Sequence, residues 1–137
     1  MRRHEAEADR WIQQAQEDLI TAEGLVQLGR HYMACFVAQQ VGEKALRAYL
    51  HWKGASIVLG HSISDLCQRC AQHDQSFKDL GHQVSMLDTF YIPTRYPNGL
   101  PAGIPAHVYT ERASAEALEM ARTAIQFVID RMRPAQT

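Results

Sequence analysis

The sequence has no run of roughly 18 uninterrupted apolar residues, the length that a membrane-spanning helix needs. It has only three cysteines, Cys35, Cys67 and Cys70. An odd number of cysteines does not form a disulfide framework, which favours a reducing compartment over secretion. The first residues, MRRHEAEADRW, lack the apolar segment of a signal peptide. These absences predict a cytoplasmic protein.

The chain also lacks a large excess of charge of either sign. Lys and Arg total 14 against 15 Asp and Glu, which gives a formal net charge of −1. A strongly basic chain would suggest a polyanion-binding protein, so any contact with nucleic acid here must come from a local patch. Common catalytic motifs are missing too: there is no glycine-rich phosphate loop after a strand, no Gly-x-Ser-x-Gly and no inward carboxylate pair.

What the sequence does contain is helical periodicity along most of its 137 residues, a length typical of one domain, so 1–137 is treated as a single helical domain. No alternating pattern of useful length predicts a strand, and the SIVL stretch is too short and isolated to pair. The sequence therefore predicts an all-α fold, an antiparallel up-and-down bundle of about five helices, over residues 5–29, 31–53, 62–70, 77–90 and 111–131.

Local signals mark where these helices begin and end. Gly54 ends the second helix, and Ser62 and Asp65 have the spacing of a capping box that starts the third. Residues 91–107, YIPTRYPNGLPAGIPAH, hold all but one of the five prolines and are predicted to be irregular. A long irregular loop just before the last helix of a compact domain is usually functional or mobile.

The second helix, residues 31–53, is apolar or small around most of its circumference. Such a helix is buried, because an ordinary surface helix is about half polar. Its polar side chains gather into one narrow stripe, since each residue advances by about 100°. We expect this stripe to face water, a ligand or another chain; its members are Gln40, Glu43, Lys44, Arg47 and His51, and Tyr32 and Phe36 continue it.

Several motifs in order resemble the HEPN domain family. They are AEADRWIQQAQEDLITAEGL, AQQVGEKALRAYL followed by Gly54, GHSISDL, and FYIPTRYP before an alanine-rich closing helix. The resemblance covers about residues 6–131. It implies a helical bundle that commonly dimerises and a role in nucleotide or RNA biology. It also implies a small nucleotidyltransferase as partner, in a toxin–antitoxin-like pair.

One departure from the family pattern concerns catalysis. Ribonuclease members carry an Arg followed after about four to six residues by a His in the closing helix, whereas this chain has no His from Glu111 onward. Imidazole and guanidinium must act together to move a proton and to stabilise the phosphorane. The sequence thus predicts a non-catalytic binding protein. A metal-independent ribonuclease would need an unusual pair brought together by folding, Arg47 with His51 or Arg95 with His107.

The polar stripe supplies the first set of predicted nucleotide-binding residues. Lys44 and Arg47 would meet phosphates, Gln40 would contact a base or ribose, and Glu43 would orient Arg47. Two alternatives stay open. Glu43 and Arg47 would form an ordinary i,i+4 pair on a solvated strip, or the same charges would pair across a dimer interface.

The second set lies outside this helix. His61 precedes the predicted cap, where helix N-termini favour anions; the alternative is a structural imidazole bonded to the backbone. Arg95 would bind phosphate while Tyr91 and Tyr96 stack on a base. In the alternative, the prolines fix the loop and Arg95 ties it down through a carboxylate such as Glu43.

Cysteine and histidine spacing raises the question of a metal. Cys67, Cys70 and His73 follow one another at three-residue intervals, but the third position leaves the face of a helix shared by the first two. A tetrahedral zinc site would then need a remote ligand such as His82. The two cysteines are therefore predicted to be small core residues, and neither a metal nor a cofactor is predicted.

Overall fold

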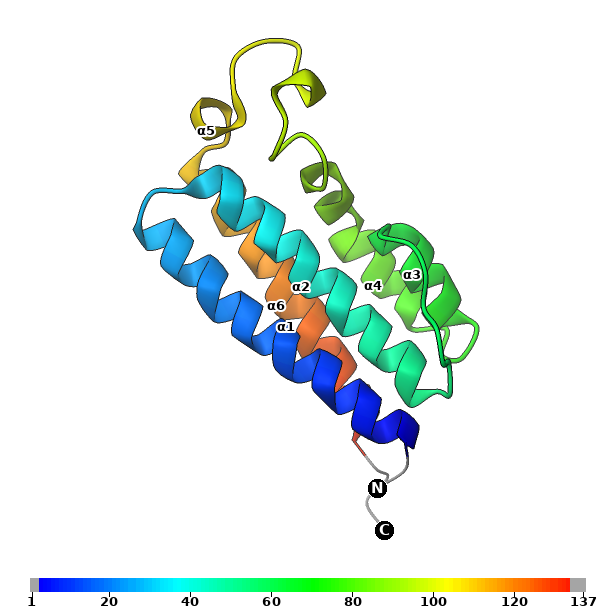
Figure 1. Ribbon diagram of the computed structural model, residues 1–137. Coiled ribbons are helices and arrows are strands. Elements are labelled where there is room, and N and C mark those ends of the chain that lie inside the picture. The colour runs from blue at the N-terminus through cyan, green and yellow to red at the C-terminus, as the bar shows by residue number, and fades with distance from the viewer. Residues whose placement is uncertain (1–2, 134–137) are drawn as a thin grey trace.

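The computed structural model describes residues 3–133, and all its regular elements in that range are helical (Figure 1). Helix α1 (Arg3–Gln27) is followed by α2 (His31–Trp52), which runs back antiparallel to it. The short helices α3 (Ile63–Ala71) and α4 (Phe77–Val84) lie on one side of α2, and α6 (Glu111–Met132) closes the bundle on another. The predicted all-α up-and-down bundle is confirmed.

Helix α2 is the central helix of the bundle. It contacts α1, α3, α5 and α6, and 13 of its 22 residues are buried. Six of the buried residues are alanine, cysteine or glycine, which lets neighbouring helices approach closely. At Gly42 an added Cβ would lie 3.0 Å from Leu87 Cδ1 and 3.1 Å from Ile63 Cδ1. A larger residue there would push the Ile63 side chain of α3 and the Leu87 side chain, within residues 85–90, away from α2.

Helix α3 begins at the predicted cap, with a second cap that the sequence did not reveal. The Ser62 hydroxyl accepts from the Asp65 backbone N–H at 3.1 Å, as expected for a capping residue. Asp88, from the 3₁₀ helix η1 (Ser85–Phe90), accepts from the backbone N–H groups of Ile63 at 2.6 Å and Ser64 at 3.1 Å. One carboxylate thus joins the start of α3 to the end of the α4 segment.

The proline-rich segment, residues 91–107, is more regular than the sequence predicts. It includes the 3₁₀ turn η2 (Pro97–Gly99) and most of the helical turn α5 (Pro105–Val108), so the helices outnumber the predicted five. Both turns begin at a proline, whose fixed φ suits the first helical position and whose missing N–H is not needed there. The segment projects beyond one end of the bundle (Figure 1).

Within residues 3–133, no helix combines the length and the apolar character that crossing a membrane requires.

We predict that Asp88→Ala lowers the free energy of unfolding by about 1–2 kcal/mol, because the start of α3 loses an N-terminal cap. Urea denaturation measures the change. Asp9→Ala is the matched control, because within residues 3–133 Asp9 accepts only from exposed Gln13 on its own helix. This substitution should cost less than about 0.5 kcal/mol. Equal losses for the two variants would contradict the capping role.

Candidate functional site

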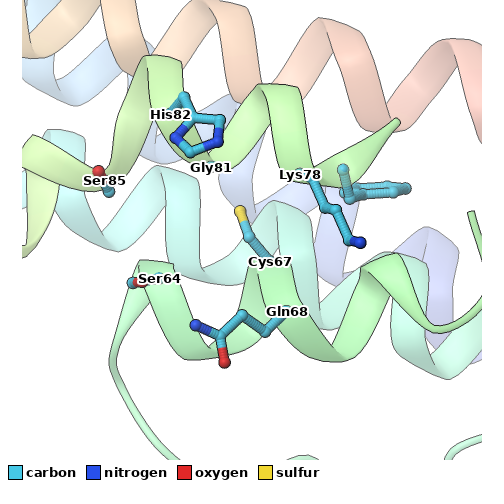
Figure 2. Close-up of a pocket in the computed structure, with 8 residues that line it drawn as sticks. Ser64, Cys67, Gln68, Lys78, Gly81, His82 and Ser85 are labelled. Carbon is cyan, nitrogen blue, oxygen red and sulfur yellow. The ribbon is translucent and has the colours of Figure 1, made fainter. Parts of the chain in front are cut away.

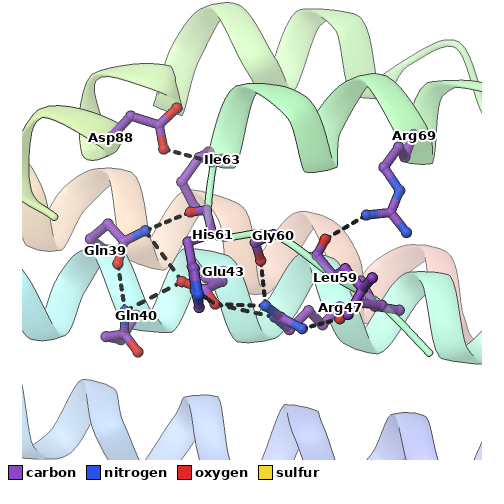
Figure 3. A network of polar contacts seen from close by, with 11 residues as sticks. Gln39, Gln40, Glu43, Arg47, Leu59, Gly60, His61, Ile63, Arg69 and Asp88 are labelled. Atoms are coloured by element: carbon purple, nitrogen blue, oxygen red, sulfur yellow. Dashed lines mark hydrogen bonds and ion pairs between the residues drawn. The ribbon is translucent and has the colours of Figure 1, made fainter.

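The centre of the polar stripe is a buried carboxylate, that of Glu43, which is 5% exposed. Its Oε1 accepts from Arg47 Nη2 at 3.0 Å and Nε at 3.2 Å, and from His61 Nδ1 at 2.9 Å (Figure 3). Its Oε2 accepts from Gln40 at 3.3 Å and from Gln39 at 3.4 Å. Every partner is a side-chain N–H, so the negative charge is satisfied inside the protein.

The Arg47 guanidinium makes two sets of structural hydrogen bonds. Besides Glu43, it donates to the backbone carbonyls of Val58 and Gly60 in the loop between α2 and α3. Its side chain is only 11% exposed. The i,i+4 pair of the first alternative is therefore confirmed, but the solvated strip in that alternative is wrong, because the loop covers the pair.

Lys44 faces α1 and not the loop between α2 and α3. Its ammonium forms an ion pair with Asp18 on α1, and the two side chains are 25% and 18% exposed. Gln40 donates to Gln39 at 2.7 Å as well as to Glu43. The structure thus separates Lys44 from the rest of the predicted site.

His61 connects the hydrogen bonds around Glu43 to the protein surface. Its side chain is 57% exposed although Nδ1 is held by buried Glu43. The imidazole stacks on Tyr91, with ring centroids 5.1 Å apart and planes 18° from parallel. Because Tyr91 belongs to the proline-rich segment, this stack joins the α2–α3 loop to that segment.

Arg95 lies among aromatic rings. Its guanidinium carbon is 4.4 Å from the ring centroid of Phe36, 4.7 Å from that of Tyr91 and 5.3 Å from that of Tyr96. Its Nε donates to the Tyr91 backbone carbonyl at 2.8 Å. We call Phe36, His61, Tyr91, Arg95 and Tyr96 the Arg95 cluster.

No carboxylate neutralises Arg95 within residues 3–133. The alternative in which Arg95 pairs with Glu43 is wrong, because Arg47 and His61 already occupy the Glu43 carboxylate. The side chain is held by its Nε bond and by the rings, so its terminal nitrogens are oriented without an anionic partner. A guanidinium in this state is suited to bind phosphate or carboxylate bidentately.

The structure does not assemble either of the unusual Arg–His pairs. His51 stacks on Trp11 with centroids 5.7 Å apart, and its Nδ1 donates to the Ala55 carbonyl at 2.8 Å; within residues 3–133 it shares no hydrogen bond with Arg47. His107 shares no hydrogen bond with Arg95 in the described part of the chain. The imidazole and guanidinium that do meet are those of His61 and Arg47, on the same oxygen of Glu43.

Gln39 and Asp88 were missed by sequence reasoning. Gln39 is fully buried and donates to the His61 carbonyl at 3.0 Å, which positions the loop. Gln39 and Glu43 are four residues apart on a predicted helix, so the sequence could have indicated that their side chains are neighbours. Asp88 had no local signal, because its partners are more than 20 residues away.

The cysteines lie in the core, as predicted: Cys67 is 2% exposed and Cys70 is fully buried. Burial raises the pKa of the Cys67 thiol to about 12, so it stays protonated at neutral pH. His73 packs edge-on against Tyr49, with centroids 6.3 Å apart. Among residues 3–133 no three His, Cys, Asp or Glu side chains are grouped to hold a metal.

The hollow beside Cys67, between α3 and α4, has a volume of about 330 Å³ (Figure 2). Lys78 and His82 from α4 and Gln68 from α3 are among its lining residues. None of the predicted nucleotide-binding residues lines it. This hollow is therefore separate from the Arg95 cluster.

The fold and the cluster define a small all-α bundle domain with a basic and aromatic surface at one edge of its central helix. A model of the HEPN domain family matches residues 8–132, and the chain therefore belongs to that family. TT1696 from Thermus thermophilus is 39% identical over 90% of this chain and 97% of its own, with a TM-score of 0.85. The archaeal HEPN homologue ST0689 is 32% identical over 97% and 100%, with a TM-score of 0.76. A comparison with curated proteins gave no match.

We predict that Arg47→Ala lowers the free energy of unfolding by about 3 kcal/mol, because it leaves the buried Glu43 carboxylate without its main partner. Lys44→Ala breaks a partly exposed pair and should cost less than about 1 kcal/mol. Urea denaturation measures the free energy of unfolding of both variants. Arg47→Lys keeps the positive charge but lacks the paired N–H donors of the guanidinium, so its loss of stability should lie between those of Arg47→Ala and Lys44→Ala. A loss for Lys44→Ala as large as that for Arg47→Ala would contradict the central role of Arg47.

Proposed function

We propose that this HEPN protein is a non-catalytic binding protein that takes a nucleotide or an RNA end at the Arg95 cluster. The observation that carries the proposal is the Arg95 guanidinium, which three aromatic rings surround at 4.4–5.3 Å and which no carboxylate of residues 3–133 pairs. Phosphate recognition favours such a planar, pre-oriented donor.

The neighbours of Arg95 supply the remaining functions of a nucleotide site. Tyr96 is half exposed, so its ring is available to stack on a base. Exposed His61 presents Nε2 as a further hydrogen-bonding group, while Glu43 holds Nδ1. Tyr91 contacts both the His61 imidazole and the Arg95 guanidinium and so links their positions.

The predicted roles of the α2 residues change accordingly. Arg47 and Glu43 act as positioning residues, since both are buried in the network that fixes the loop and His61. Gln40 belongs to the same network. Lys44 pairs with Asp18 and is not part of the proposed ligand contacts.

The lack of catalysis in this proposal has two supports. Helix α6 contains no histidine, so the Arg–His pair of ribonuclease members is missing from its usual place. The Arg47 guanidinium, which shares the Glu43 Oε1 acceptor with His61, already donates to Glu43 and to two loop carbonyls. It has little capacity left to stabilise a phosphorane.

The proposed setting comes from the family resemblance. The protein would work in the cytoplasm beside a small nucleotidyltransferase, in a toxin–antitoxin-like pair. A reading frame for such an enzyme next to the gene, and co-purification of the two chains, would support this setting.

We predict that ATP, GTP or a short RNA binds the protein in calorimetric titration and that Arg95→Gln weakens binding by about tenfold or more, because charge-assisted hydrogen bonds are lost. Arg112→Gln is the matched control, since Arg112 is 90% exposed on α6 and pairs with Glu116. Absence of binding at millimolar ligand, or equal affinities for the two variants, would rule out this site.

A second function, that of a dimeric protein–protein interaction module, is favoured by a different observation. The proline-rich segment and its neighbours expose apolar side chains at 43–50%: Ile92, Tyr96, Ile104 and Val108. Aromatic and aliphatic groups beside an arginine are common in protein interfaces. The family also commonly dimerises.

For this alternative we predict a dimer by light scattering that Ile104→Asp weakens by about tenfold, since a charge would be buried in the interface. Ile20→Asp, on α1 and 63% exposed, is the control and should leave assembly unchanged. A monomer at all concentrations would exclude the module. Loss of nucleotide binding in Arg95→Gln without loss of the dimer would assign the cluster to the ligand.

A further inference from the structure

The hollow between α3 and α4 has no part in the proposed function. Its volume of about 330 Å³ lies near the lower end of the range for small-molecule sites in proteins. Three of its lining residues, Cys67, Phe77 and Gly81, are buried or partly buried, and we call them the floor. Lys78 and Ser85 lie toward opposite ends, about 10 Å apart along the helical chain (Figure 2). The hollow therefore has room for one ring with a small substituent.

Polar side chains from both helices line the hollow above this floor. Gln68 belongs to α3, Lys78 and His82 belong to α4, and all three are exposed. Within residues 3–133, none of these three side chains forms a hydrogen bond or an ion pair. An apolar floor with a few convergent polar groups is the usual composition of a small-molecule site.

The charge of the lining favours an anion at one end of the hollow. Lys78 is its basic residue, whereas Asp65 and Asp79 of the same two helices are not among the lining residues. Asp88 lies close to the Ser64 end, because its carboxylate accepts from the Ser64 backbone N–H at 3.1 Å. Figure 2 shows Ser64 and Lys78 toward opposite ends of the hollow. An anion would therefore bind at the Lys78 end and be repelled from the Ser64 end.

Gly81 leaves space in the floor that the fold itself does not require. Glycine inside a helix is less stable than alanine, because its backbone loses more freedom on folding. Gly81 lies in the middle of the 8-residue α4 and has no positive φ. An added Cβ would lie 3.4 Å from Cys67 Cβ, which is an ordinary contact. Neither backbone conformation nor packing thus demands glycine here, whereas a ligand in the hollow would.

We infer that this hollow binds a small organic anion, which consists of a phosphate or carboxylate group on an apolar body about the size of one ring. The anionic group accepts from the Lys78 ammonium and the Gln68 amide, and the apolar body covers Cys67 and Gly81. Charge-assisted hydrogen bonds and burial of apolar surface then both contribute to affinity. The inference goes beyond the proposed function, because the hollow shares no residue with the Arg95 cluster.

The test is an NMR titration of the isotope-labelled full chain with phenyl phosphate, and with benzoate as the carboxylate probe. We expect saturable shifts of the α3 and α4 amide signals at millimolar concentrations of at least one of the two anions. Neutral benzyl alcohol should bind at least about fivefold more weakly, because it lacks the charge-assisted hydrogen bonds. Inorganic phosphate should also bind more weakly than phenyl phosphate, because it has no apolar body to bury.

Two substitutions test the two halves of the site. Lys78→Gln should weaken phenyl phosphate binding about fivefold or more, because the charged donor is lost. Lys53→Gln is the matched control: Lys53 is an exposed lysine outside the hollow, and its loss should change affinity less than about twofold.

Gly81→Ala should weaken phenyl phosphate binding about fivefold, because the added methyl group occupies the floor, while the thermal unfolding midpoint stays the same or rises. The unfolding measurement separates a filled hollow from a damaged fold.

The outcomes distinguish this site from the Arg95 cluster. Phenyl phosphate binding that is lost in Arg95→Gln and kept in Lys78→Gln overturns the inference and assigns the anion to the cluster. Absence of saturable shifts in α3 and α4 overturns the inference and leaves the proposed function standing. Equal affinities for Gly81→Ala and the unsubstituted chain also overturn it, since the ligand would then not cover the floor.

Discussion

A carboxylate held almost out of contact with water has to be satisfied, and in this protein the Glu43 carboxylate determines what lies around it. Burying an unpaired charge would cost several kcal/mol, so donors must converge on it. Arg47, Gln39 and Gln40 come from α2 itself, and His61 comes from the following loop. The loop is thereby drawn onto the central helix, and an exposed imidazole is placed beside it.

The surface features follow from that placement. His61 gives Tyr91 a ring to stack on, and Tyr91 in turn provides a carbonyl and a ring for Arg95. Phe36 of α2 provides a further ring against the Arg95 guanidinium. A few contacts therefore link the buried Glu43 carboxylate to the exposed Arg95 cluster. Substitutions in the hydrogen bonds around Glu43 should change the positions of His61, Tyr91 and Arg95.

The sequence predicts the helices well because their causes are local. Apolar spacing, the Ser62 cap and the Gly54 end are all visible within a few residues. The site was only partly predictable, because helical spacing shows which side chains share a face but not what comes to meet them. Lys44 and Arg47 are one turn apart, yet Asp18 of α1 meets the first and the loop carbonyls meet the second. Residues that contact each other across the chain have no signal in one sequence.

The loop between α2 and α3 is fastened in an unusual way. The carbonyls of Val58, Leu59 and Gly60 accept from Arg47 and Arg69, whereas the backbone N–H groups of residues 56–62 donate no hydrogen bond within the described chain. Amide hydrogen exchange depends on breaking such donor bonds. These amides would therefore exchange with solvent deuterium faster than the hydrogen-bonded amides of α2 and α3, while the arginines keep the segment in one position. Rapid isotope exchange at this loop would be a mark of its side-chain anchoring rather than of motion.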